Sequence, residues 1–332
     1  MKKEKILVTG AAGFIGSEFV RQAVKKGYKV IVTDKLTYAA DLARLKDLKG
    51  RFKFYKVDIC SKKGISDIFR KNKPEIIVNF AAQTHVDRSI LESSPFVKTN
   101  IFGTRNLLDA AAKNDIKRFI HISTDEVYGE IKKGKFYENS PLNPSSPYSA
   151  SKAAADLLVK AYVRTFDFPA IIIRPSNTYG PWQYPEKFMP VIIFKALKNE
   201  KVPVYGKGLN VREWLYVSDC AGAILTVMEK GRVGEVYNLG SGIKKKNIEV
   251  VKTILDILKK PYSLIEFVKD RPGHDYRYCL DSSKLKKEIK WHAKTDFASG
   301  IKKTICWYKT NLEWVERKAN YLASYWETVY KK

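Results

Sequence analysis

The sequence contains few cysteines, few histidines and no long apolar run. Its four cysteines are far apart and form no CxxC pair, so we expect neither a disulfide framework nor a zinc site, and a reducing cytoplasm suits this pattern. No stretch approaches the ~18 consecutive apolar residues that a membrane helix needs. The basic start of the chain is followed by an apolar run of only Ile6–Val8, which favours a strand over a signal peptide.

Acidic residues are also scarce, since 61 Lys and Arg stand against 35 Asp and Glu and leave a net charge of +26. Such an excess is typical of proteins that bind nucleic acid or a membrane surface. Here, however, the basic residues are spread along the whole chain, without a basic arm, a zinc finger or an RNA-binding aromatic signature. We therefore interpret the charge as a lysine-rich solvated surface and expect no specific nucleic-acid or membrane partner.

What the sequence does contain is a regular alternation of apolar strands and helical patterns in its first half. Near-continuous Ile and Val runs suit strands that are buried on both faces, as in a parallel sheet between helices. The expected strands cover residues 5–10, 29–34, 52–59, 75–82, 118–124 and 170–176, and the expected helices cover residues 16–27, 42–50, 62–72, 100–114 and 146–166. This alternation predicts an α/β fold with a doubly wound, Rossmann-type parallel sheet.

The pattern changes after residue 176, where strands become short and Pro and Gly are frequent. We expect residues 1–176 to form a Rossmann domain and residues 177–332 to form mostly a smaller, interleaved α/β substrate domain. A strand and a helix within residues 217–242 return to the first domain in this interpretation. Residues 312–332 form an expected amphipathic helix. Core or subunit packing is expected for its aromatic residues Trp314, Tyr321, Tyr325 and Trp326.

Three glycines, Gly10, Gly13 and Gly16, separate the first expected strand from the first helix. A turn at this place needs glycine where the backbone approaches a pyrophosphate, and the N-terminus of the next helix faces the phosphates. Asp34 ends the second strand, where a carboxylate accepts both ribose hydroxyls of NAD and repels the 2′-phosphate of NADP. A strand-end cap is the alternative for Asp34, and the adjacent Lys35 keeps NADP open. NAD is the expected cofactor.

Tyr148 and Lys152 stand four residues apart in the helix expected at 146–166, so both project from one face. An ammonium beside a phenol stabilises the phenolate, and we expect it to lower the pKa of Tyr148. A tyrosine tuned in this way can remove a hydroxyl proton while hydride leaves the same carbon. This YxxxK pair follows a strand-end motif, STDEVYG, which carries the adjacent acids Asp125 and Glu126.

The glycine turn, the strand-end Ser and Thr and the YxxxK pair resemble the extended short-chain dehydrogenase/reductase superfamily over essentially the whole chain. The motif STDEVYG narrows the resemblance to its nucleotide-sugar 4,6-dehydratases, as do DKLTYA, HVDRSI, PEKFMP, YGKGLNVREWLYV and DRPGHDYRY. Such an enzyme oxidises C4 of a hexose, eliminates water across C5 and C6, and returns the hydride to C6. This chemistry needs a redox base, a carbon base and a general acid in one site.

The resemblance implies Tyr148 as the redox base, Glu126 as the base at C5 and Asp125 as the acid at C6. It also implies that Thr124 bonds the C4 oxygen and that Lys152 supports Tyr148. Adjacent carboxylates in a closed site raise the pKa of one of them, which suits a protonated Asp125. The division of labour between the two acids rests on the resemblance alone. In an arbitrary sequence, an Asp-Glu pair in a surface turn is the alternative.

The resemblance further implies two sets of binding residues. Those expected at the cofactor are Gly10, Gly13, Phe14, Ile15, Gly16, Asp34, Lys35, Thr37, Asp58, Ile59, Ala81, Ala82, Thr99, Tyr148, Lys152 and Asn177. Those expected at the nucleotide sugar are Thr84, Thr124, Asn177, Lys187, Pro203, Tyr205, Arg212, Asn247, Arg271, His274 and Tyr278. Arg212 and Arg271 are expected at the pyrophosphate. Taken singly, Asp58 is equally compatible with a plain turn residue. Each of the two arginines, taken singly, is compatible with an ordinary surface cation.

The expected substrate is dTDP-glucose, and UDP-glucose remains the alternative because Gln83 is familiar in relatives that act on either nucleotide. A 4-epimerase is less favoured because epimerases of this superfamily generally lack the adjacent acids. A degenerate, non-catalytic NAD- and RNA-binding protein is disfavoured because every catalytic residue is present.

His85 and His121 are expected to be structural, and no metal is expected. Residues 100–114 and 150–163 are expected to join a homodimer, the alternative being simple packing on the sheet.

Overall fold

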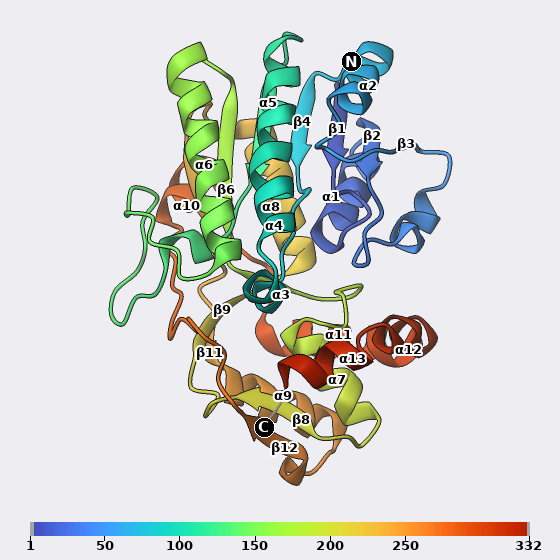
Figure 1. Ribbon diagram of the computed structural model, residues 1–332, viewed down its shortest axis with the longest axis vertical. Coiled ribbons are helices and arrows are strands. Elements are labelled where there is room, and N and C mark those ends of the chain that lie inside the picture. The colour runs from blue at the N-terminus through green and yellow to red at the C-terminus, as the bar shows by residue number, and fades with distance from the viewer. Residues whose placement is uncertain (1–2, 331–332) are drawn as a thin grey trace.

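Seven parallel strands form the centre of the structure, a computed structural model that describes residues 3–330 (Figure 1). The strands are β1 Lys5–Thr9, β2 Lys29–Asp34, β3 Phe52–Lys56, β4 Ile76–Asn79, β5 Arg118–Ile122, β6 Ala170–Pro175 and β10 Val236–Leu239. Their order is β10-β6-β5-β4-β1-β2-β3, which confirms the predicted doubly wound fold. The order reverses between β1 and β4, so the carboxyl ends of these strands open the crevice where such sheets bind ligands.

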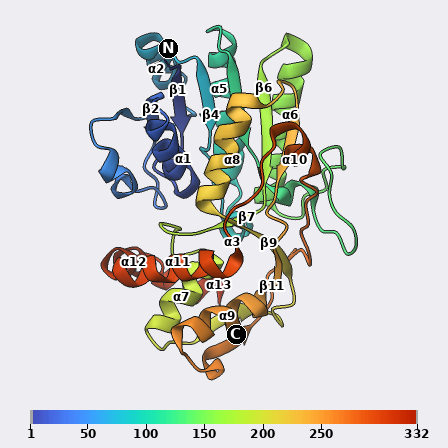
Figure 2. The same ribbon diagram turned by 180° about the vertical axis from the view of Figure 1, so that it is seen from behind.

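Helices cover both faces of this sheet (Figures 1 and 2). On one face lie α1 Phe14–Lys25, α8 Val217–Lys230 and α10 Ser283–Ile289, and on the other lie α2 Lys62–Asn72, α5 Thr104–Ala112 and α6 Pro147–Phe166. Successive residues of a strand enter different layers, so Ile6 and Val8 join the α1 layer and Leu7 joins the α5 layer. Because both layers are apolar, the strands are near-continuous hydrophobic runs.

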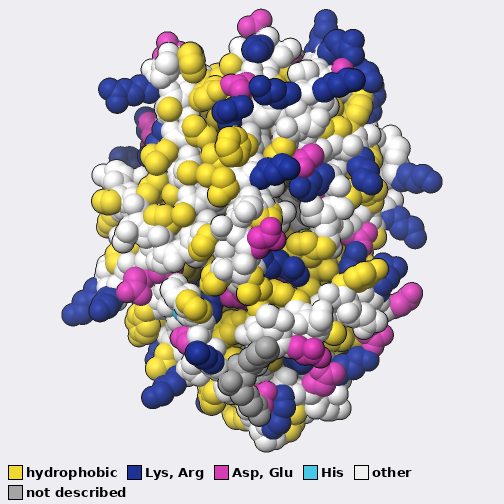
Figure 3. Space-filling view, in the orientation of Figure 1, with side chains coloured by type: hydrophobic (Ala, Val, Ile, Leu, Met, Phe, Trp, Pro, Cys, Tyr) yellow, Lys and Arg dark blue, Asp and Glu magenta, His cyan; other side chains and the backbone are white. Residues whose placement is uncertain are grey.

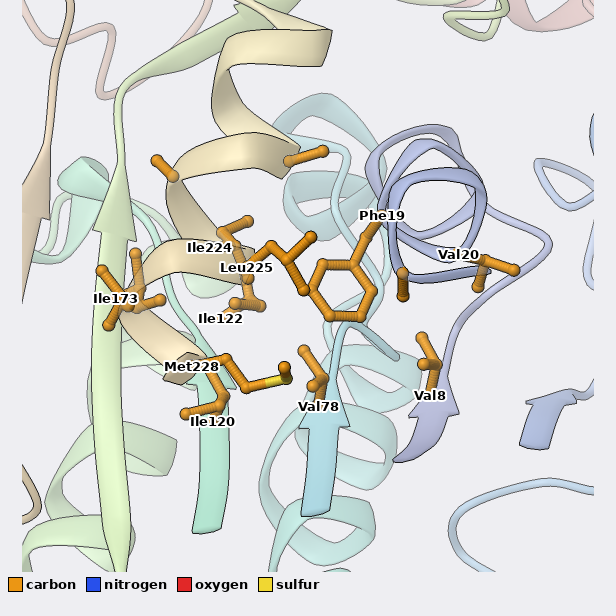
Figure 4. Packing of buried hydrophobic residues seen from close by; sticks show 14 of the residues in the cluster. Val8, Phe19, Val20, Val78, Ile120, Ile122, Ile173, Ile224, Leu225 and Met228 are labelled. Carbon is orange, nitrogen blue, oxygen red and sulfur yellow. The ribbon is translucent and has the colours of Figure 1, made fainter. Parts of the chain in front are cut away.

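Large side chains fill the layer between α1, α8 and the sheet. Phe19 of α1 points toward Leu225 of α8 and Val78 of β4, and Met228 lies between Ile120 and Val78 (Figure 4). All five side chains are buried. Because interiors of this kind are close-packed, the layer holds α1 firmly behind β1. The N-terminus of α1 therefore stays at the crevice.

A second region lies beyond the carboxyl ends of the large sheet, in the lower half of Figure 1. It contains the sheets β11-β9-β7 and β12-β8. The strands are β7 Asn177–Tyr179, β8 Val202–Tyr205, β9 Val211–Tyr216, β11 Lys244–Lys246 and β12 Ile265–Val268, and the helices are α7 Phe188–Leu197, α9 Asn247–Leu258, α11 Phe297–Thr310, α12 Leu312–Asn320 and α13 Ala323–Val329. Its separate core includes Trp214, Ile254 and Tyr308.

The two regions are interleaved along the chain. After β7, α7, β8 and β9, the chain returns through α8 to the large sheet, where Val236 of β10 pairs with Ile172 of β6. It then leaves again through β11 and α9. Short helical segments connect the larger elements: η1 Leu42–Leu48, α3 Val86–Leu91, α4 Ser94–Phe96, η2 Val97–Gly103, η3 Asp125–Tyr128 and η4 Tyr262–Leu264. Within residues 3–330, no helix is both long enough and apolar enough to cross a bilayer.

Three segments differ from the expected helices. Residues 42–48 form the 3-10 helix η1, whose first turn is capped by the side chain of Asp41. The helix expected at 100–114 begins as the π-helix η2, where the Asn100 side chain bonds the Gln83 backbone and the Ser151 hydroxyl. The tail forms two helices, α12 and α13, and Tyr321 lies at the break with 77% exposure. Core packing of Tyr321 is therefore wrong, whereas its packing against a second subunit stays a prediction. Residues 1–2 and 331–332 of the predicted ranges lie outside the described residues.

Candidate active site

The glycine turn lies at the crevice, where β1, α1 and β4 meet. Gly10 has a φ of +64°, and a Cβ at this position would lie 2.6 Å from the backbone nitrogen of Ala81. At Gly16 a Cβ would lie 2.5 Å from the carbonyl oxygen of Gly10. Helix α1 begins at Phe14 after Gly13, and no side chain caps its first N–H groups. This bare backbone cradle at a helix N-terminus fits the pyrophosphate of a dinucleotide.

Asp34 lies buried at the rim of this cradle, at the end of β2. Its carboxylate accepts hydrogen bonds from the backbone N–H groups of Ala12, at 3.0 Å, and Leu36, at 2.8 Å, so it also caps the strand end. Lys35 pairs with Asp58 at 3.1 Å. An ammonium already paired with a carboxylate is a poor anchor for a 2′-phosphate, and Asp34 adds negative charge beside it. The rim therefore fits NAD better than NADP.

Arg44, which the sequence did not single out, is fully buried beneath the same rim. Its guanidinium donates hydrogen bonds to the carbonyl oxygens of Ala12, Ala39 and Trp182. These three carbonyls belong to the glycine turn, the loop after β2 and the second region, so Arg44 ties the three segments together. Burial lowers the pKa of Arg44 to about 10. No short motif marks an arginine in this role, and only the three-dimensional contacts reveal it.

Tyr148 and Lys152 lie in the first turns of α6, and both are buried. The Nζ of Lys152 donates to the carbonyl oxygen of Ile122 at 2.7 Å, and burial lowers the pKa of Lys152 to about 8. Burial and then the charge of Glu126 raise the pKa of Tyr148, and the hydrogen bond with Thr124 offsets only part of this rise. The expected lowering of the Tyr148 pKa is therefore wrong, because burial and the nearby carboxylates disfavour the phenolate. The Lys152 ammonium is directed at a backbone carbonyl.

Asp125 is enclosed directly after β5, at the start of η3. Thr124 caps this segment by accepting from the N–H of Glu126 at 3.3 Å. Asp125 is 2% exposed, and its Oδ2 has no hydrogen-bond partner among residues 3–330. Burial, followed by the charges of Glu126 and Glu213, raises the pKa of Asp125 well above its ordinary value. This carboxyl group is suited to keeping its proton and donating it.

Glu126 has a different electrostatic environment. Burial raises the pKa of Glu126, but the cations Arg271, Arg212 and Lys187 counteract this rise. Two adjacent carboxyl groups thus differ in their tendency to hold a proton, and such a difference separates a general acid from a general base. The geometry suits Glu126 as the ionised member of the pair.

The substrate side of the crevice carries two enclosed guanidinium groups. Arg212 donates to the carbonyl oxygen of Asp275 at 2.9 Å and lies over the Tyr278 ring, 4.2 Å from its centroid. Arg271 lies 3.5 Å from Asp87, and its Nε has no hydrogen-bond partner among the described residues. Enclosed arginines with donors to spare fit an anionic ligand such as a pyrophosphate.

Three histidines lie around the crevice. His274 lies 2.6 Å from Asp270, and burial lowers the pKa of His274 to about 4, so this ring is neutral at physiological pH. His85 faces the backbone carbonyl of Glu186. His121 is completely buried behind the site, 3.6 Å from Asp156. In the part of the chain that the structure describes, no cluster of three His, Cys, Asp or Glu side chains could hold a metal ion.

The structure brings the sequence-predicted residues together in two adjoining pockets. All sixteen residues expected at the cofactor line the first pocket, together with Thr124, Asp125 and Glu126. The residues expected at the nucleotide sugar, apart from Thr124, line the second, and Thr84, Glu126, Asn177 and Lys187 belong to both. Charged or polar pocket residues that the sequence analysis assigned no role include Arg44, Asp87, Gln183 and Glu186. Asp87 and Glu186 lie within HVDRSI and PEKFMP, which the sequence analysis noted only as family motifs.

The parallel sheet, the glycine cradle and the YxxxK pair define the class of this protein as an extended short-chain dehydrogenase/reductase. Comparison with known proteins narrows this class. Residues 7–304 match the family described as GDP-mannose 4,6 dehydratase, and the chain belongs to this family.

Similar proteins of known name agree with this assignment. The chain is 46% identical to a dTDP-glucose 4,6-dehydratase of Xanthomonas campestris pv. campestris, over 93% of this chain and 94% of that protein. It is 46% identical to the Escherichia coli enzyme of the same name, over 94% and 96% of the two chains. A crystal structure of dTDP-glucose 4,6-dehydratase from Streptomyces venezuelae, with NAD and TYD bound, has a TM-score of 0.92 and 42% identity, and the match covers 95% of this chain and 99% of that one.

Replacing Gly10 by alanine tests the cradle. The new methyl group would collide with the Ala81 backbone, so we expect NAD affinity measured by calorimetry to fall by about 100-fold or more. Gly242→Ala is the matched control, because its φ is +84° and nothing lies within 4 Å of the added Cβ. The control carries only the backbone strain, about 1–2 kcal/mol. Equal NAD binding by the two variants would contradict the cradle.

Proposed function

We propose that this chain is a dTDP-glucose 4,6-dehydratase that uses NAD and forms dTDP-4-keto-6-deoxyglucose. The observation that carries the proposal is the pair Asp125 and Glu126, adjacent in sequence but unequal in electrostatic environment, beside Tyr148. A 4-epimerase eliminates no water and has no use for a carbon base next to a protonated acid. The two named relatives at 46% identity support the same activity.

The residues of the first pocket fit NAD. The turn Gly10–Gly16 would hold the pyrophosphate, Asp34 the adenosine ribose and Lys152 the nicotinamide ribose. When bound, NAD accepts hydride from C4 of the sugar and returns it at C6. In this proposal residues 1–176, together with the returning segment 217–242, hold the cofactor, and most of residues 177–332 hold the nucleotide sugar.

The chain's own residues then divide the proton transfers. Thr124 would donate a hydrogen bond to the C4 oxygen. Tyr148, whose phenolate the positive charge of bound NAD⁺ would favour against its raised pKa, would take the proton of the C4 hydroxyl as hydride leaves that carbon. The C4 ketone acidifies the C5 proton, which Glu126 removes because Arg271, Arg212 and Lys187 favour its ionised form. Asp125 gives its proton to the C6 oxygen, which leaves as water, and Glu126 gives a proton back to C5 when hydride arrives at C6. Tyr148 and Asp125 return to their starting protonation states by exchange with solvent.

Incubation with dTDP-glucose and with UDP-glucose in D₂O tests the activity and the nucleotide. We expect dTDP-glucose to yield a 4-keto product that has lost one water and carries deuterium at C5, as read by mass spectrometry and NMR. We expect kcat/KM for UDP-glucose to be lower by about tenfold or more. A 4-epimerase would give an isomer of unchanged mass without deuterium at C5, and that outcome would exclude the dehydratase.

The two acids are tested by Glu126→Gln and Asp125→Asn. Each should lower kcat by about 10²-fold or more. In the wild type, activity should rise with pH as Glu126 ionises and fall at higher pH as Asp125 loses its proton, because the pKa of Asp125 is raised well above its ordinary value. Asp125→Asn should remove the high-pH decline and Glu126→Gln the low-pH rise. The reverse pattern would exchange the two roles.

We further propose that the enzyme is a cytoplasmic homodimer. Its four cysteines are free, which suits a reducing compartment. Hydrophobic side chains gather over α5 and α6 in the upper left of Figure 3, and Leu91, Phe102 and Leu157 are 59%, 53% and 57% exposed. An apolar face of this kind fits an isologous helix–helix contact between two copies.

Sedimentation of charged variants tests the dimer. Leu157→Glu together with Phe102→Glu should convert a wild-type dimer into a monomer, because two carboxylates per subunit cannot be buried unpaired. Phe267→Glu is the matched control, since Phe267 is 57% exposed on β12, at the other end of the molecule from these helices. A wild-type protein that sediments as a monomer would refute the proposal.

A further inference from the structure

Arg174 is a completely buried arginine near the end of β6, the strand that lies beside α6 (Figures 1 and 2). Its Nε donates a hydrogen bond to Oδ2 of Asp156 in α6 at 2.8 Å, and Asp156 is completely buried as well. Its Nη1 donates to the hydroxyl of Tyr128 in η3 at 2.7 Å. One guanidinium group therefore joins α6 to η3, and the proton transfers described above use none of these three residues.

Helix α6 carries the redox pair of the site. Asp156 follows Lys152 by one turn and Tyr148 by two turns, so the three side chains project from one side of the helix. The first turn of α6 is also held by a capping box, in which the side chains of Ser146 and Ser149 each accept a hydrogen bond from the other residue's backbone N–H. The start of this helix therefore has a support of its own, separate from Arg174.

Segment η3 carries the two acids at its start and Tyr128 at its end. The Tyr128 hydroxyl accepts the hydrogen bond from Arg174 and donates one to Oδ1 of Asn238 in β10 at 2.7 Å. Burial raises the pKa of Tyr128 to about 12, so the hydroxyl keeps the proton that this second bond requires. A 3-10 segment of four residues has weak internal hydrogen bonds. Contacts at its ends therefore determine where Asp125 and Glu126 lie.

Stability alone is a weak reason to bury these charges. Both partners of a buried ion pair lose their hydration, and apolar side chains of similar volume would often stabilise a core at least as well. The cost is larger here because Nη2 of Arg174 and Oδ1 of Asp156 have no hydrogen-bond partner among residues 3–330. A guanidinium group, however, holds two partners in fixed directions, because its donors lie in one plane. The arrangement is suited to positioning.

We propose that Arg174 is a positioning residue that fixes the acids of η3 relative to the redox pair of α6, through Tyr128 and Asp156. The inference rests on the proposed function, because Glu126 must reach C5 of the same sugar whose C4 hydroxyl Tyr148 deprotonates. Arg174, Asp156 and Tyr128 line neither of the two pockets, so their effect passes through the segments that they join. A misplacement of about 1 Å can cost about 100-fold in rate.

Tyr128→Phe tests the link, because it removes one hydroxyl and leaves the buried ion pair in place. Oxidation at C4 precedes the steps of the two acids, so a displaced η3 should slow the elimination and spare the oxidation. We expect kcat to fall about 10-fold or more and bound NADH to accumulate during turnover, as read by its absorbance. Calorimetry should show dTDP affinity within about twofold of the wild type. An unchanged kcat, or a fall without accumulated NADH, would overturn the proposal.

Tyr237→Phe is the matched control. Tyr237 is completely buried in the α1 layer. Its hydroxyl likewise accepts one hydrogen bond, from the N–H of Arg232 at 3.0 Å, and donates another, to Glu288 at 2.8 Å. Both variants should lose thermal stability to a similar extent, but only Tyr128→Phe should lose kcat and accumulate NADH. Equal kinetics in the two variants would indicate a purely structural role and overturn the proposal.

A double-mutant cycle tests the route through Arg174. Asp156→Asn and Tyr128→Phe each loosen the same guanidinium group, so their combined effect on kcat should be smaller than the sum of the two free-energy changes. Additive effects would overturn the proposal. Should Asp156→Asn not fold, because it leaves a buried charge unpaired, Tyr128→Phe and its control decide alone.

Wild-type turnover in the same assay keeps the two levels of inference apart. An active wild type, with a Tyr128→Phe variant that behaves like Tyr237→Phe, contradicts only the role of Arg174. A wild type that does not dehydrate dTDP-glucose contradicts the proposed function and this inference with it.

Discussion

The attraction between Glu126 and its three cations is the interaction on which the rest of the site depends. Lys187 precedes α7, Arg212 lies in β9 and Arg271 follows β12, whereas Glu126 itself comes directly after β5 of the large sheet. One carboxylate therefore faces side chains that only the second region supplies. Burial of so many charges is unfavourable unless each is paired or hydrogen-bonded, and the carbonyl and carboxylate partners around Arg212, Arg271 and Lys187 meet that requirement.

The same constraint explains why Asp125 and Glu126 differ although their side chains are identical in chemistry and adjacent in sequence. An extended residue points to the opposite side of the backbone from its neighbour, and a short helical turn rotates the next side chain further. Both carboxyl groups line the cofactor pocket, but Asp125 also has the negative charge of Glu213 nearby, whereas Glu126 has the cations Arg271, Arg212 and Lys187. A step of one residue is enough to give two acids different electrostatic surroundings.

Sequence reasoning found the parts of the site that are local in the chain. The glycine turn, Asp34 and the Tyr148–Lys152 pair each form a motif of fixed spacing. The near-continuous apolar runs, alternating with helical patterns, were enough to predict the sheet. The direction of the Tyr148 pKa shift could not be found in this way, because YxxxK spacing shows neither how deeply Tyr148 is buried nor that Lys152 bonds the Ile122 carbonyl. Arg44 and Glu186 were missed for a related reason, since their partners lie up to 148 residues away. Tyr321 is exposed at a break between helices α12 and α13, and no glycine or proline in the sequence predicts that break.

The interleaving of β10 with the second region has a consequence for the order in which the protein can be made. Strand β6 ends at residue 175, but its outer neighbour β10 begins only at Val236, after most of the small sheets have been synthesised. A growing chain therefore leaves the apolar edge of β6 without a partner for some sixty residues. Unpaired edges of this kind are sites of aggregation, and distant pairings slow folding. The large sheet cannot be completed as an independent N-terminal unit on the ribosome.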